Sequence, residues 1–191
     1  VTVRVIDSVG RIQTERATAA VPVTDLGGDA VLGADTDADL LPISVIERHG
    51  GDGAVGNGFV RGIGLDRGAV GTTVAHDAHN CLVAGASHAA MARVANHLRS
   101  IDGGVAAYDP DADAVESLAL PVGGLVADAP LPEVQRGFAA VESAAESLGL
   151  AHEGGLHVLT FLALEVIPEL RLTNNGLVDV DAFEHVDVIA E

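Results

Sequence analysis

FVRGIGLDRGAVGTTVAHDAHNCLVAG, residues 59–85, contains three short apolar runs of β-strand character. The runs cover residues 59–65, 69–75 and 81–84, and glycines punctuate the first two. The last two runs flank the polar segment 76–80, which is therefore predicted to form the bend between two strands. Strands this close together in the chain favour a largely antiparallel sheet.

The flanking sequence adds further strands. Residues 1–6 alternate apolar and polar side chains, residues 41–47 form another β-like run, and residues 19–24 are a weaker candidate. The acidic turn 109–113 separates runs 105–108 and 115–120, which is the pattern of a hairpin. Residues 27–39 are small and acidic, and we expect a loop there.

Helical periodicity is found in the second half. Ser87 is placed to cap a helix that runs to about residue 100, and residues 132–148 carry an apolar stripe that ends before Gly149. A third, short helical segment is predicted over residues 156–164. We therefore predict a single α+β domain over residues 1–191, with a largely antiparallel sheet flanked by two to four helices.

The charge is strongly unbalanced. Twenty-eight acidic residues face ten basic ones, all of them arginine, for a formal net charge of -18. This composition favours a halophilic protein, whose carboxylates repel one another weakly in molar salt and strongly in dilute buffer. The scattered arginines argue against a nucleic-acid partner, because phosphate binding requires clustered basic residues.

Cysteine content and hydropathy exclude other classes. Cys81 is the single cysteine, so an internal disulfide framework, a cysteine-based zinc site and the zinc deaminase signature are excluded. No apolar run approaches the ~20 residues that span a bilayer, so we expect no membrane partner and a cytoplasmic location. Because the chain starts at Val1 without a methionine, we expect a processed product or an excised domain.

The best candidate for chemistry is the polar cluster within the predicted bend, formed by His76, Asp77, His79 and Asn80. Imidazole exchanges a proton near neutral pH or binds a metal, and an adjacent carboxylate fixes its tautomer. Two histidines and one carboxylate are compatible with a partial, open metal site. The alternative is a hydrogen-bonded polar corner that orders the hairpin, which the spacing favours over metal binding, and both interpretations stay open.

Several blocks of the sequence, in order, resemble the C-terminal domain of prokaryotic adenine deaminase, a member of the amidohydrolase superfamily. The first block joins residues 45–49 to residues 58–65, and the second covers residues 68–85 with the run Thr73 to Asn80. The later blocks are residues 120–125, 160–164, 166–172 and 176–179. The sequence departs from the family pattern at residues 154–156 and at Glu165.

The resemblance implies a part in purine salvage, the hydrolysis of adenine to hypoxanthine and ammonia by a metal-dependent enzyme that uses manganese or a similar divalent ion. In that family the metal ligands lie in an upstream (β/α)8 barrel that begins with a His-x-His pair. This chain has no His-x-His pair, and a barrel needs about 250 residues. The resemblance therefore implies a barrel partner in cis or in trans, no metal bound by this chain, and no activity of the chain alone. The resemblance does not decide whether the protein forms a homo-oligomer.

On this basis, His76, Asp77, His79 and Asn80, with the candidate pocket residues Glu47, Arg48 and His49, are hypothesised to face the mouth of the barrel. There they would close or polarise the adenine site. The competing hypothesis is that the cluster only anchors the domain to the barrel or to a second subunit. Two other classes stay open: an independent metal-dependent hydrolase that uses His76, Asp77 and His79, and a non-catalytic binding or assembly module.

Overall fold

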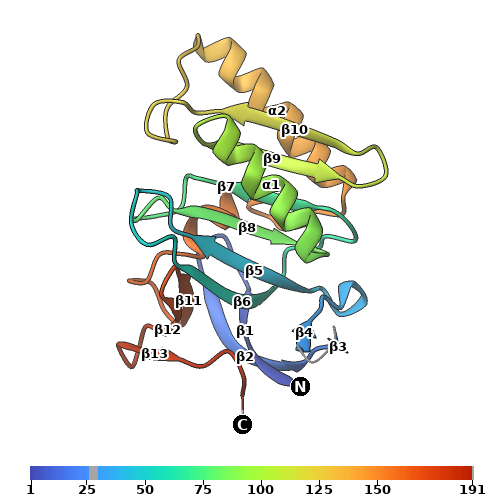
Figure 1. Ribbon diagram of the computed structural model, residues 1–191, viewed down its shortest axis with the longest axis vertical. Helices are drawn as coiled ribbons and strands as arrows, with labels where there is room; N and C mark the ends of the chain where they lie inside the picture. The colour runs from blue at the N-terminus through green and yellow to red at the C-terminus, as the bar shows by residue number, and fades with distance from the viewer. Residues whose placement is uncertain (26–29, 191) are drawn as a thin grey trace.

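The computed structural model describes residues 1–25 and 30–190 and is dominated by one eight-stranded sheet. Its strands are β1 Thr2–Ser8, β2 Thr14–Ala20, β5 Leu40–Ile46, β6 Val55–Arg61, β7 Ala69–Thr72, β8 Cys81–Gly85, β9 Gly104–Asp109 and β10 Ala114–Ala119. They lie in the order β10-β9-β7-β8-β5-β6-β1-β2 (Figure 1). Neighbouring strands are antiparallel except β1 and β6, which are parallel. The predicted α+β class is confirmed.

The two α-helices cover opposite faces of the sheet. Helix α1 (His88–Ser100) packs with Cys81 and Val83 of β8, whereas helix α2 (Leu131–Ser147) belongs to the core that contains Leu82 and Ala84. Successive side chains of β8 thus point to alternate faces, as the pleat of a strand requires. Figure 1 shows α1 in front of the sheet and α2 behind it. The Oγ atom of Ser87 accepts a hydrogen bond from Ala90 N at 3.2 Å, which confirms the predicted helix cap.

Four connections leave the same end of the sheet. Ile46 at the end of β5 pairs with Cys81 at the start of β8, Thr72 of β7 pairs with Val105, and Gly104 pairs with Ala119. Residues 47–54, 73–80, 101–103 and 120–130 therefore gather at one end, at the left of Figure 1. We call this end of the sheet the loop end. It carries every residue that the sequence singled out as a site candidate.

A smaller three-stranded sheet packs beside the main one. It consists of β11 Leu170–Thr173, β12 Gly176–Asp179 and β13 Glu184–Val186. A Cβ atom added at Gly56 of β6 would lie 1.9 Å from Thr173 O, so only glycine permits this approach of β6 to β11. The remaining short elements are β3 Val23–Asp25, β4 Ala30–Leu32 and the 3-10 helices η1 Thr36–Ala38 and η2 Gly155–Phe161.

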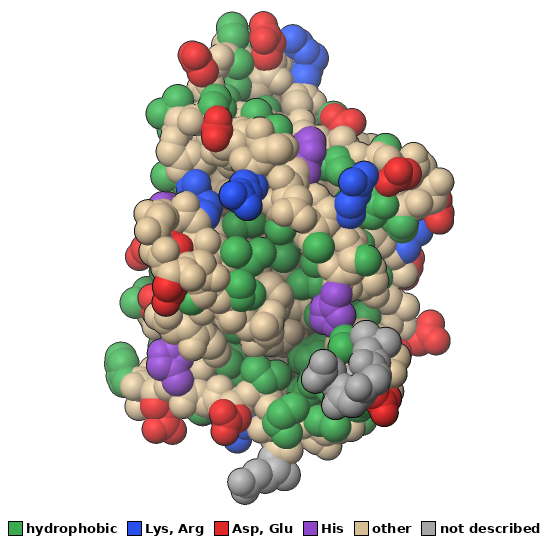
Figure 2. Space-filling model, viewed as in Figure 1, with side chains coloured by type: hydrophobic (Ala, Val, Ile, Leu, Met, Phe, Trp, Pro, Cys, Tyr) green, Lys and Arg blue, Asp and Glu red, His purple; other side chains and the backbone are tan. Residues whose placement is uncertain are grey.

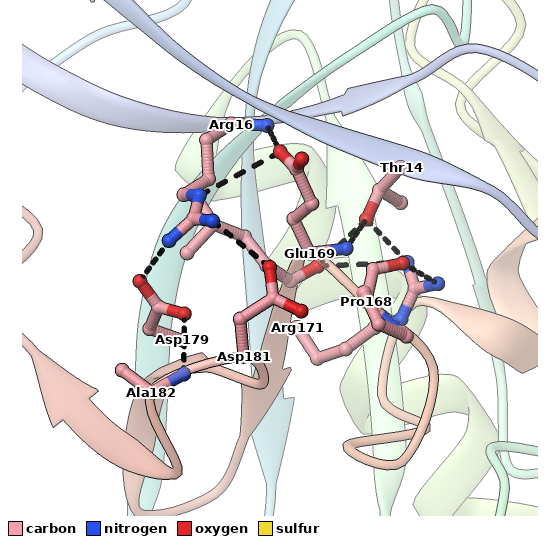
Figure 3. A network of polar contacts seen from close by, with 9 residues as sticks. Thr14, Arg16, Pro168, Glu169, Arg171, Asp179, Asp181 and Ala182 are labelled. Carbon is pink, nitrogen blue, oxygen red and sulfur yellow. Dashed lines mark hydrogen bonds and ion pairs between the residues drawn. The ribbon is translucent and has the colours of Figure 1, made fainter.

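Two arginines fasten this small sheet to the hairpin β1-β2 (Figure 3). The guanidinium of Arg171, fully buried, donates to Thr14 Oγ1 at 2.8 Å and to Ile12 O at 2.7 Å. Burial lowers the pKa of Arg171 to about 10. Arg16, which is more exposed, forms ion pairs with Asp179, Asp181 and Glu169. The buried cation of Arg171 is therefore held by neutral hydroxyl and carbonyl oxygens.

Some predicted boundaries shift. The partner of β1 is Thr14–Ala20 rather than residues 19–24, because this strand at the sheet edge exposes most of its side chains and has a weak apolar pattern. The strand predicted over residues 59–65 ends at Arg61, since Gly62 adopts a φ of 93°. Residues 156–164 form mainly the 3-10 helix η2. The predicted loop 27–39 contains β4 and η1, and its residues 27–29 lie outside the described residues.

Candidate functional site at the loop end

The connection between β7 and β8 contains the polar cluster and forms the predicted bend. His79 adopts a φ of 50°, and its N–H donates to Ala75 O at 2.7 Å, which closes the turn. The N–H of His76 donates to Thr160 O at 2.9 Å, so the bend is also attached to η2. The cluster therefore has a fixed position between the main sheet and η2.

The side chains of His76 and Asp77 reach the surface. The ring of His76 lies 5.5 Å from that of His79 in an edge-on arrangement and 5.4 Å from that of Phe161. The side chain of His76 is 36% exposed and that of Asp77 is 83% exposed. His76 Nδ1 and Asp77 Oδ1 are 4.0 Å apart, at the limit of an ion pair. Both groups thus remain available to another molecule.

His79 lies deeper. Its Nδ1 atom is buried and has no hydrogen-bond partner among the described residues. Burial, and then the neighbouring imidazole of His76, lower the pKa of His79 below its ordinary value. Because a lowered pKa favours the uncharged ring, His79 is neutral at physiological pH.

Arg48 connects three of the four loops. Its Nε donates to His79 O at 2.7 Å, and its Nη2 donates to Gly123 O at 2.6 Å. A Cβ atom added at Gly124 would lie 2.3 Å from the same Nη2, so the loop after β10 is in close contact with the guanidinium. Arg48 thus holds the bend, the loop 47–54 and the loop 120–130 together.

Glu47 and His49 complete this attachment. The carboxylate of Glu47 accepts hydrogen bonds from His49 N at 2.5 Å and Gly51 N at 3.0 Å, which order its own loop. His49 Nε2 lies 2.7 Å from Ala78 O, and because a carbonyl only accepts, Nε2 carries the proton and donates. The structure brings all seven candidate residues to one end of the sheet, while the pocket role of Glu47, Arg48 and His49 stays a prediction.

Asn80 is buried and reaches a residue that the sequence analysis missed. Its Nδ2 donates to Asn174 Oδ1 at 3.1 Å, in the turn between β11 and β12. The signal for this turn is the run Asn174-Asn175-Gly176 after an apolar segment, because such residues favour hairpin turns. Asn80 and Asn174 line a hollow of about 230 Å³ together with Glu165 and His185.

A second hollow lies on the α1 side of the bend. It has a volume of about 580 Å³, and its lining includes Arg48, Thr73, Cys81, Leu98 and Arg99. Burial raises the pKa of the Cys81 thiol to about 12, so this thiol is not a nucleophile at neutral pH. Arg48 lines this hollow and also contacts the bend, so it lies between the second hollow and the polar cluster.

The cluster does not have the geometry of a metal centre. Within residues 1–25 and 30–190, no three His, Cys, Asp or Glu side chains converge to hold a metal ion. Asp77 extends into solvent and His79 Nδ1 is buried, so these groups do not point at a common position. An independent metal-dependent hydrolase built on His76, Asp77 and His79 is therefore not favoured.

Comparison with known proteins identifies the family of this chain. Residues 11–184 match the family model described as the adenine deaminase C-terminal domain. The chain belongs to this family. It is 44% identical over 190 residues to an adenine deaminase of Moorella thermoacetica, covering 99% of this chain and 31% of that protein. It is 47% identical over 175 residues to an adenine deaminase of Cereibacter sphaeroides, covering 92% of this chain and 30% of that protein.

A further relative agrees with these two. Identity to an adenine deaminase of Methanococcoides burtonii is 42% over 161 residues, which cover 84% of this chain and 27% of that protein. This adenine deaminase C-terminal domain thus spans about 30% of the length of the curated relatives that it matches. In those relatives the domain is joined to a much longer N-terminal part. The resemblance seen in the sequence is confirmed.

Within the part of the chain that the structure describes, none of the helices has the length and apolar character needed to cross a membrane.

Proposed function

We propose that residues 1–191 form the accessory domain of an adenine deaminase, which converts adenine and water to hypoxanthine and ammonia. A metal-bearing (β/α)8 barrel, in the same polypeptide or supplied separately, performs the chemistry, and the loop end of this domain faces its substrate site. The observation that carries the proposal is a contrast among the residues that contact or form the bend. Arg48 and Asn80 brace the bend through internal hydrogen bonds, whereas His76 and Asp77 are presented outward on it.

The residues of this domain support a metal that is bound elsewhere. No described group of its side chains fits a metal ion, so the divalent metal, manganese or a similar ion, is proposed to be bound by the barrel. When bound there, it supplies the activated water for attack on the purine. The remaining parts of the proposal are a cytoplasmic location and adaptation to high salt. The net charge of -18 supports the second of these.

The roles left to this domain are orientation and exclusion of water. The exposed His76 and Asp77 are within reach of a group bound at the facing site, and a rigid bend holds them in place. His79, uncharged, packs edge-on against His76 and limits the orientations of its ring. A preorganised polar group that also displaces water strengthens electrostatic interactions with the reacting purine.

The test uses the complete enzyme with three variants. His76→Ala and Asp77→Asn are expected to lower kcat by about 10- to 100-fold, as for groups that support a metal site from outside its ligands. Asp37→Asn is the matched control, because Asp37 is an exposed aspartate in η1 and lies away from the loop end. Unchanged kcat and KM in both cluster variants would eliminate the pocket role and leave the anchoring hypothesis.

A second measurement concerns the isolated chain. Without the barrel it is expected to show no adenine turnover, with or without added manganese. Turnover by the 191-residue chain alone would overturn the proposal.

A further inference from the structure

A group of exposed apolar side chains lies on the segment 120–131, which follows β10 at the loop end. Val122 is 56% exposed, Val126 is 58% exposed and Leu131 is 68% exposed. Leu125 is also exposed. Large apolar side chains scattered singly over a surface are ordinary, but here four of them fall within ten consecutive residues, and Val122 and Val126 pair directly. We call residues 120–131 the apolar segment.

The apolar segment is also poor in charge. Asp128 is its only charged residue, although 20% of the whole chain is charged and the net charge is -18. Figure 2 shows acidic side chains spread around the face that it views. A chain that keeps so many carboxylates at its surface but nearly none along an exposed apolar stretch has the composition of an interface core, where charged residues are depleted.

The backbone of the apolar segment is fixed. Val122 and Val126 form a bridge with hydrogen bonds of 3.1 and 3.2 Å between their backbone groups. Gly123 O accepts from Arg48, and Gly124 O accepts from Thr73 Oγ1 at 2.6 Å. The exposed side chains are thus held in place before any partner binds, which reduces the entropy lost on association.

We infer that the apolar segment is the docking surface for the N-terminal catalytic part of adenine deaminase, an inference that rests on the proposed function. The chain spans about 30% of the length of its relatives, in which a much larger body of polypeptide accompanies this domain. The apolar segment shares one anchor with the bend that carries His76 and Asp77, because Arg48 donates both to His79 O and to Gly123 O. Docking there positions these residues against the catalytic part and covers the apolar side chains at the same time.

The test is amide hydrogen exchange of residues 120–131 in the complete enzyme and in the isolated 191-residue chain, read together with adenine turnover. Exchange in the apolar segment is expected to be about tenfold slower or more in the complete enzyme. Val126→Asp is expected to remove that difference. It should lower adenine turnover roughly tenfold or more, while leaving the melting temperature of the isolated chain unchanged because residue 126 is exposed.

Val9→Asp is the matched control. Val9 is 50% exposed, similar to Val126, and follows β1. Strand β1 runs parallel to β6, which starts at the loop end, so Val9 lies at the opposite end of the sheet. The control variant should retain both the slow exchange and the turnover.

The outcomes separate this inference from the proposed function. Equal exchange of the apolar segment in both forms, with adenine turnover intact, would overturn the inference and leave the proposed function standing. Slow exchange in the complete protein without adenine turnover would overturn the proposed function, and the apolar segment would then be a docking surface for an N-terminal part of another activity. Protection that arises in the isolated chain as its concentration rises would assign the surface to a second copy and would also overturn the inference.

Discussion

The guanidinium Nε of Arg48 donates a hydrogen bond of 2.7 Å to the backbone oxygen of His79, 31 residues further along the chain. This contact makes Arg48 a brace for the polar bend. Its Nη2 extends the brace to Gly123, so one side chain fixes the relative positions of the bend and the apolar segment. The loop end therefore depends on a residue whose partners are backbone oxygens.

Replacing Arg48 should loosen the loop end. Arg48→Gln loses the hydrogen bonds to His79 O and Gly123 O, and we expect the free energy of unfolding to fall by about 1–2 kcal/mol. Urea unfolding measures this loss, and hydrogen exchange should become faster in residues 73–80 and 120–126. Arg99→Gln, a variant of an exposed arginine in the same hollow, should change stability by less than about 0.5 kcal/mol. Equal losses in the two variants would contradict the bracing role.

A glycine pair in β6 tests the packing of the small sheet. An alanine Cβ at position 56 would clash with Thr173 O, and we expect Gly56→Ala to lower the free energy of unfolding by about 3 kcal/mol. At position 58 the added Cβ would lie 3.4 Å from Leu172 Cδ1, which is an ordinary contact. Gly58→Ala should therefore be close to neutral in chemical denaturation. Similar stability of the two variants would show that β6 and β11 do not approach this closely.

His152 should make stability depend on pH. Its Nδ1 accepts from Gly154 N at 2.9 Å and its Nε2 lies 3.1 Å from Ser8 Oγ, an arrangement that needs the neutral ring. Burial is the main cause that lowers the pKa of His152. The unfolded chain, with a histidine pKa of about 6.5, then binds the proton more readily than the folded one, so stability falls as the pH drops below that value.

The comparison that isolates this effect is between the wild type and His152→Gln. The urea midpoint of each protein is measured at about pH 8 and at about pH 6. Both pH values lie above the range in which most carboxylates titrate. The decrease of the midpoint over this range should be smaller in the variant. Parallel decreases would assign the pH dependence to other groups.

Salt should stabilise the fold. The Debye length is about 30 Å in 0.01 M salt and about 3 Å in 1 M salt, so repulsion within a chain of net charge -18 is screened in molar KCl. We expect a higher melting temperature in molar KCl and loss of the fold in dilute buffer. A melting temperature that is the same in both solutions would argue against halophilic adaptation.

Much of the local structure could be predicted from the sequence. Ser87 caps α1, the acidic turn 109–113 joins β9 and β10, and the segment 76–80 is the bend between β7 and β8. Each of these features is encoded within a few residues, by the periods of helices and strands and by the chemistry of caps and turns. The blocks that resemble the adenine deaminase family could likewise be found in order along the sequence, without the structure.

The roles of individual site residues depended on the tertiary structure. Arg48 interacts with the backbone of a residue 75 positions away, and Asn80 bonds a side chain 94 positions away. Every residue has a backbone carbonyl oxygen, so the sequence does not indicate which loop Arg48 contacts. The sequence by itself determined the strands, the helices, the acidic surface and the family. Only the folding of β5, β7, β10 and β11 against one another decided that hydrogen bonds tie Arg48 to two other loops and Asn80 to the turn after β11, while the side chains of His76 and Asp77 reach the surface.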